Sequence, residues 1–260
     1  MNPILSEMLA TRRVRTRDGS DVPLDSEISM EEGAALQRFI VAGRPRVTLE
    51  VGCAFGVSTL FICEALAEVG GQKHIVIDPH QEHGWKGLGL YNAERAGFRS
   101  LVEFHGESSH RVLPALEAAG ERVGVALIDG WHTFDYAMVD FFFVDRLLDV
   151  RGIVVLDDTA AYPAVRKLAR YVATHRRYEV ADTSAGATTP GPGLSRVVSS
   201  ALSSFPLRRL ARHLVRPDIL RPDSALGLPP GNFIAFRKIA DDVLGDGAAG
   251  TRRWDQHSDF

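Results

Sequence analysis

The sequence has little of what marks secreted, membrane-spanning or nucleic-acid-binding chains. Only two of its 260 residues are cysteines, Cys53 and Cys63, so a disulfide framework is not expected, and we interpret both as small buried hydrophobic residues. No run of 18 apolar residues occurs, and no apolar segment near the N-terminus resembles a secretory signal. We therefore expect no membrane span and a cytoplasmic protein. A net charge of -3 gives no reason to expect nucleic acid or an anionic membrane as a partner.

The pattern G-x-G-x-x-G, which binds dinucleotide pyrophosphates, is also missing. Residues 47–56 instead read VTLEVGCAFG. A short apolar run containing Glu50 ends in a turn between Gly52 and Gly56, and a helical pattern follows from Ser58. Glycine permits a sharp turn and a close ligand approach, and the next helix directs its N–H groups toward that place. This pattern predicts a nucleotide-like site at the end of the first parallel strand.

Apolar runs alternate with helical patterns along the chain, which indicates an α/β fold. We expect a Rossmann-like, doubly wound, mostly parallel seven-stranded sheet with helices on both faces. Several runs are apolar almost throughout, as is typical of strands buried on both faces. The expected strands are residues 47–51, 74–78, 101–105, 123–129, 152–157, 178–181 and 232–239. The expected helices are residues 30–41, 58–69, 87–96, 109–119, 134–148 and 164–175.

The chain divides into a core and three accessory parts. We expect an N-terminal helical segment at 1–45, a core at 46–181 that is completed by a last strand at 231–239, and a mobile tail at 240–260. Between them lies an inserted basic arm at 182–230, in which Pro206 is placed to start a helix. The arm is interpreted as a lid, a membrane-touching patch, an element packed on its own domain, or the contact of a homodimer.

The spacing E-x-G-x-x-x-G resembles motif I of class I S-adenosylmethionine (SAM) methyltransferases. The resemblance implies that SAM is the cofactor and that Glu50 faces its charged amino-acid end. Asp78, at the end of the second strand, is placed to accept hydrogen bonds from ribose hydroxyls. The predicted cofactor-binding residues are Glu50, Gly52, Gly56, Ser58, Asp78, Gly106, Ser108 and Asp129. The alternatives are that the glycines only make a tight turn, that Asp78 caps a loop before Pro79, or that the cofactor is a nicotinamide.

Three carboxylates follow neighbouring strands of the expected sheet. Asp129 ends the fourth strand, and Asp157 and Asp158 end the fifth. Carboxylates gathered at one edge of a sheet are costly to bury unless a cation joins them. Oxygen ligands in this number suit Mg²⁺, Mn²⁺ or Ca²⁺. The sequence therefore predicts a divalent-cation site beside the cofactor.

The patterns D-x-W-[K/H] and D-[D/N] resemble the metal-dependent O-methyltransferases of the catechol type and their actinobacterial natural-product relatives. The resemblance covers about residues 31–171. It implies that Asp129, Asp157 and Asp158 bind the cation and that His132 takes the proton from the substrate. The chain departs from the catechol enzymes at two positions, since His132 replaces their lysine and Asp158 their asparagine. The general base and the substrate class therefore follow less directly than the metal.

Other interpretations of these residues stay open. Asp158 or Thr159 is placed to cap the next helix, and His132 is able to bond a loop carbonyl. Four further histidines are also candidates for the base, namely His80, His83, His105 and His110. The leading hypothesis is a SAM-dependent O-methyltransferase that acts on a hydroxyl of a small molecule, such as a catechol-like or sugar hydroxyl of a secondary metabolite. The alternatives are a metal-independent methyltransferase and a non-catalytic SAM-binding regulatory module.

Overall fold

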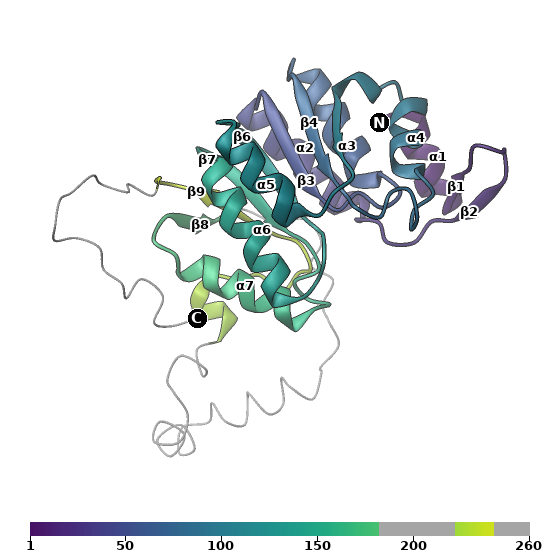
Figure 1. Ribbon diagram of the computed structural model, residues 1–260. Helices are drawn as coiled ribbons and strands as arrows, with labels where there is room; N and C mark the ends of the chain where they lie inside the picture. The colour runs from purple at the N-terminus through teal and green to yellow at the C-terminus, as the bar shows by residue number, and fades with distance from the viewer. Residues whose placement is uncertain (182–221, 242–260) are drawn as a thin grey trace, which may run out of the picture.

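A seven-stranded sheet forms the centre of the computed structural model, which describes residues 1–181 and 222–241. Its strands run in the order β5-β4-β3-β6-β7-β9-β8 (Figure 1). Neighbouring strands are parallel except where β9 pairs antiparallel with β7 and β8. The predicted fold class is confirmed. The strands are β3 (Val47–Val51), β4 (Lys73–Ile77), β5 (Val102–His105), β6 (Val123–Ile128), β7 (Leu148–Leu156), β8 (Tyr178–Val180) and β9 (Ile234–Lys238).

Helices cover both faces of the sheet. Figure 1 shows α5, α6 and α7 lying across one face, and the helices α1, α2 and α3 belong to the apolar cluster on the other. Val154 and Leu156 of β7 pack into the first cluster, whereas Ile153 and Val155 pack into the second. Both faces of the strand are therefore buried, which explains its continuous apolar sequence. The helices are α1 (Pro3–Thr11), α2 (Met30–Gly43), α3 (Val57–Glu68), α4 (Leu88–Arg95), α5 (Ser109–Ala118), α6 (Phe134–Leu147) and α7 (Pro163–Thr174).

The N-terminal segment contains more structure than the sequence patterns predict. Besides α1 it includes a small antiparallel sheet of β1 (Arg13–Arg15) and β2 (Asp21–Pro23). The following helix, α2, begins with a capping box: Glu32 N donates to Ser29 Oγ at 3.2 Å, and Ser29 N donates to Glu32 Oε2 at 2.7 Å. This reciprocal pair satisfies two backbone donors and fixes where α2 starts.

Most of the predicted arm and tail, including the helix expected at Pro206, lies outside the described residues. The described end of the arm forms a short 3₁₀ helix, Asp223–Leu226, which contacts α7. Asp223 accepts a hydrogen bond from Arg166 Nε at 2.9 Å and a second from Arg170 Nη1. Within the residues that the structure describes, no helix is both long and apolar enough to cross a membrane.

The turn after β3 contains three residues with positive φ, namely Ala54 and the two glycines that bracket it. Gly52 has φ +90° and Gly56, the N-cap of α3, has φ +84°. A Cβ on Gly52 would lie 2.0 Å from the carbonyl oxygen of Asp129. Only glycine therefore allows the end of β3 to approach the end of β6 this closely.

Replacing Gly52 by alanine is expected to destabilise the fold by more than about 3 kcal/mol, because the new methyl group would overlap backbone atoms in addition to straining φ. Gly19 is a matched control, since its φ is +85° but no atom lies within 4 Å of the added Cβ. Gly19→Ala is expected to cost only about 1 kcal/mol. Urea unfolding of both variants measures the difference, and equal losses would contradict the close-approach explanation.

Candidate functional site

A cavity of about 650 Å³ lies at the carboxyl ends of the parallel strands. Its size is within the usual range for small-molecule sites. The residues that line it come from segments far apart in the sequence, brought together by the order of the strands. The predicted site residues among them are Gly52, Asp78, Ser108, Asp129, His132, Asp157 and Asp158.

Glu50 and Ser58, two predicted cofactor-binding residues, do not line this cavity. Glu50 is fully buried and accepts hydrogen bonds from Ser58 Oγ at 2.8 Å and from Thr59 Oγ1. His74 Nε2 lies 3.2 Å from its carboxylate. A carboxylate at the first turn of a helix is also favoured by the helix dipole. Glu50 thus ties the start of α3 to β3 behind the cavity wall.

The two other predicted glycines, Gly56 and Gly106, do not line the cavity either. A Cβ on Gly56 would lie 2.9 Å from the carbonyl oxygen of Gly89, in the first turn of α4. Gly56 therefore allows α3 and α4 to start close together. Of the additional histidines considered as bases, only His80 is among the lining residues that the structure describes.

Asp78 lines the cavity, but most of the hydrogen bonds that its carboxylate can accept come from other groups of the protein. Its Oδ2 accepts from Cys53 N at 3.2 Å, Ala54 N at 3.1 Å and Gln81 Nε2 at 2.9 Å. Its Oδ1 accepts from His80 N at 2.8 Å. The carboxylate thus braces the glycine turn and caps the loop after β4. One lone pair on Oδ1 stays available to a ligand.

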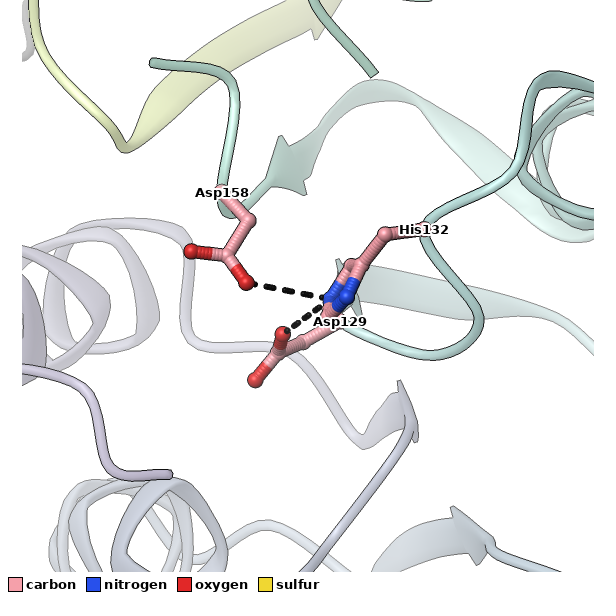
Figure 2. Close-up of side chains that lie close together, drawn as sticks. All are labelled: Asp129, His132 and Asp158. Atoms are coloured by element: carbon pink, nitrogen blue, oxygen red, sulfur yellow. Dashed lines mark ion pairs between the residues drawn. The ribbon is translucent and has the colours of Figure 1, made fainter. Parts of the chain in front are cut away.

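Asp129, His132 and Asp158 converge from the ends of β6 and β7, as Figure 2 shows. His132 Nε2 lies 3.1 Å from Asp158 Oδ2 and 3.5 Å from Asp129 Oδ1. One ligand atom from each residue falls within 4.8 Å of the others. The ring of Tyr162 stacks on the imidazole with 4.2 Å between centroids. No described residue forms a well-aligned hydrogen bond with Nε2, which is buried between the two carboxylates.

Asp157 and Asp158 are held by Asn232, a residue that the sequence patterns do not identify. Asn232 Nδ2 donates to Asp158 Oδ1 at 2.9 Å and to Asp157 Oδ1 at 3.3 Å. Its own Oδ1 accepts from Ala160 N and Ala161 N, both at 3.1 Å. Asp157 Oδ1 also accepts from Asp158 N at 2.7 Å. The antiparallel pairing of β7 with β9 brings Asn232 here, and only the strand order reveals that pairing.

The interpretation of Asp158 or Thr159 as a helix cap is wrong. The N-cap of α7 is Tyr162, and no side chain bonds the first turn. Thr159 Oγ1 instead donates to the carbonyl oxygens of Gly231 and Asn232, at 2.9 and 3.0 Å. Asp158 has φ +59°, in the left-handed region. A non-glycine residue in that region is often found at functional sites.

The electrostatics of the cluster fit a bound cation. Burial, together with the charge of Asp129, raises the pKa of Asp157 well above its usual range. Burial and the charge of Asp158 likewise raise the pKa of Asp129. The Asp129 carboxylate in turn raises the pKa of His132. No lysine or arginine is among the described lining residues. The excess negative charge and the buried, unbonded His132 Nε2 suit a small divalent cation at this place.

Comparisons with known proteins agree with this geometry. Residues 49–159 match a family described as a methyltransferase domain. Among solved structures, the chain is similar to cofactor-bound Rv0187 from MTB, with 22% identity and a TM-score of 0.56 over 70% of this chain and 82% of that chain. The O-methyltransferase TomG from Streptomyces achromogenes, in complex with SAM, shows 20% identity and a TM-score of 0.56 over the same shares.

A third similar structure is an O-methyltransferase from Bacillus cereus in complex with S-adenosylhomocysteine (SAH), with 18% identity and a TM-score of 0.55 over 70% of this chain and 83% of that chain. Likeness at this level of identity shows a shared fold. Comparison with curated protein sequences finds no match.

The domain match and the fold point to the same class. Residues 49–159 match a methyltransferase domain, and the sheet has the fold of the SAM- and SAH-bound methyltransferases that the chain resembles. The resemblance drawn from the glycine turn is confirmed at that level.

Asp140 of α6 lines the same cavity and gives a test of the site's electrostatics. It is 1% exposed, and burial raises its pKa to about 6. The unfolded chain has an aspartate pKa near 3.8, so ionised Asp140 destabilises the fold above about pH 6, and the penalty vanishes below about pH 4. The difference corresponds to roughly 3 kcal/mol at most.

Asp140→Asn is therefore expected to raise the free energy of unfolding at pH 8 by about 2–3 kcal/mol, with no gain near pH 4. Urea unfolding at pH 4, 6 and 8 measures the effect. Asp149→Asn is the control, because Asp149 is exposed and pairs with Arg122 at the other end of the sheet. A pH-independent change in Asp140→Asn would contradict the explanation.

Proposed function

We propose that this enzyme transfers the methyl group of SAM to a hydroxyl oxygen of a small molecule, with the help of a divalent cation and of His132 as general base. The observation that carries the proposal is the convergence of Asp129, His132 and Asp158 in the cavity beside the glycine turn. A hydroxyl is a poor nucleophile at neutral pH, so a site that transfers a methyl to oxygen needs groups that stabilise the oxyanion and take its proton.

The cofactor side of the proposal uses the lining residues around the turn. Gly52 offers bare backbone, Asp78 offers one lone pair of Oδ1 to a ribose hydroxyl, and Ser108 faces the cavity from the end of β5. Glu50, Gly56, Ser58 and Gly106 are assigned to the shape of this wall, behind the ligand. Asp129 lies between the cofactor side and the acidic cluster.

Asp129, Asp157 and Asp158 are the proposed cation ligands. Asp129 Oδ1 and Asp158 Oδ2 both lie beside His132 Nε2, and Asp157 Oδ2 accepts no hydrogen bond from the described residues. Asn232 fixes the two carboxylates of β7 in place. A bound Mg²⁺, Mn²⁺ or Ca²⁺ supplies Lewis-acid chemistry, lowering the pKa of a hydroxyl that it contacts.

His132 is the proposed acceptor of the hydroxyl proton. Its imidazole is held by stacking against Tyr162. The neighbouring Asp129 carboxylate raises the pKa of His132 and so strengthens it as a base. Only the neutral imidazole accepts a proton, and for this reason the reaction requires a pH above the His132 pKa.

The proposal extends to the substrate class and the compartment. Two similar structures are named O-methyltransferases, and one of them is described as involved in Tomaymycin synthesis. They support a hydroxylated acceptor from secondary metabolism, with catechol-like and sugar hydroxyls both suited to a cation. Cys53 and Cys63 are free, buried thiols, which agrees with action in the reducing cytoplasm.

Removal of the metal is expected to abolish methyl transfer to a catechol, and added Mg²⁺ to restore it. In calorimetry, Mg²⁺ is expected to bind at least about tenfold more weakly to Asp129→Asn than to the wild type, because one ligand charge is lost. Asp149→Asn, far from the cavity, is the control for the calorimetry. Activity that is indifferent to both EDTA and Mg²⁺ would favour the metal-independent alternative.

His132→Ala is expected to lower kcat by about 10²–10⁴ while SAM affinity stays near the wild-type value. In the wild type, kcat is expected to rise with pH through the raised pKa of His132, above the pH at which an unperturbed histidine titrates. This limb should be absent from the pH profile of the variant. His83→Ala, outside the cavity lining, is the control. An unchanged kcat in His132→Ala would show that His132 is not the general base.

A further inference from the structure

The cavity wall carries more negative charge than the proposed reaction uses. The lining carboxylates are Glu27, Glu32, Asp78, Asp129, Asp140, Asp157 and Asp158. No lysine or arginine lines the cavity within residues 1–181 and 222–241. A divalent cation and the sulfonium of SAM together neutralise only part of this charge. The negative charge that remains acts on the methyl acceptor, which is the third ligand of the cavity.

Glu32 lines this wall and, apart from its place in the capping box of α2, has no role in the proposed reaction. Glu27 already forms an ion pair with Arg12. Glu32 Oε2 accepts the backbone N–H of Ser29, and no described cationic side chain pairs with it. Glu32 lines the same cavity as Asp157 and Asp158. Its carboxylate is therefore placed to meet an acceptor bound in the cavity.

Two further features of the lining favour a positively charged ligand. The rings of Trp131 and Tyr162 are 58% and 43% exposed although both line the cavity. One face of Tyr162 stacks on His132, whereas the more exposed ring of Trp131 presents an electron-rich face that attracts ammonium groups. Asp140 is 1% exposed, and its Oδ1 has no hydrogen-bond donor among the described residues. The groups of the wall that lack a partner are thus hydrogen-bond acceptors and aromatic faces. Such groups favour a bound ammonium group and disfavour a bound carboxylate.

We propose that the natural acceptor is a hydroxylated small molecule that carries a protonated amine, and that Glu32 binds this amine. The inference rests on the proposed function, because it concerns the acceptor of that reaction. The ammonium group takes no part in the transfer. It orients the acceptor by an ion pair with the Glu32 carboxylate, in a cavity where burial strengthens the pair relative to water.

The test compares three ring diols that differ in charge: 3,4-dihydroxybenzylamine, 3,4-dihydroxybenzyl alcohol and 3,4-dihydroxybenzoate. Their binding to the full chain loaded with SAH and Mg²⁺ is measured by calorimetry, and methyl transfer is measured separately with SAM. The variant is Glu32→Gln. Glutamine keeps the capping box of α2, so only the charge is removed. Glu31→Gln is the matched control, because Glu31 lies in the same first turn but does not line the cavity.

The amine is expected to bind about tenfold or more tightly than the alcohol, and the acid most weakly. This order should collapse in Glu32→Gln and persist in Glu31→Gln. Equal binding of the three compounds, no binding of any, or an unchanged order in Glu32→Gln would overturn the inference. A loss of SAH affinity in Glu32→Gln would assign Glu32 to the cofactor and overturn it as well. Charge-ordered binding without methyl transfer would instead contradict the proposed function alone.

Discussion

The repulsion among carboxylates fixed at neighbouring strand ends is the constraint on which the site depends. Backbone hydrogen bonds hold them there: Asp129 N donates to Val51 O at 2.9 Å, and Asp157 N donates to Ile128 O at 3.2 Å. Because the sheet prevents the carboxylates from separating, their charge has to be met by protons or by bound cations. The raised pKa values of Asp129 and Asp157 are one expression of this constraint.

On the opposite side of the cavity, hydrogen bonds hold the turn after β3 rigidly. Glu50 anchors the first turn of α3, and Asp78 holds the backbone of Cys53 and Ala54. Both carboxylates therefore act mainly on the protein. A turn braced in this way keeps its N–H groups and bare backbone in position without a ligand, which lowers the ordering cost of binding. The site thus combines a stiff cofactor wall with a strongly charged wall for the chemistry.

The sequence predicts the parts of this structure that depend on local patterns. Apolar runs and helical periodicity correctly indicate the sheet, its strands and the six helices from α2 to α7, since both faces of the sheet are buried. The sequence motif does not predict the face of the sheet on which Glu50 lies, because strand register and packing determine that face. Asn232 is distant from Asp158 in sequence, and only the order of β7 and β9 makes them neighbours. The sheet of β1 and β2 escapes prediction because each strand has three residues.

The position of Asn232 has a consequence for biosynthesis. Asn232 lies just before β9, the last strand of the described sheet, so a ribosome releases most of the Rossmann-like core well before the residue that aligns Asp157 and Asp158. Domains begin to fold during synthesis from their N-terminal parts. The nascent core can therefore assemble its cofactor wall first and acquire an ordered acidic cluster only when β9 inserts between β7 and β8. Alignment of the acidic cluster is in this sense a late event of folding.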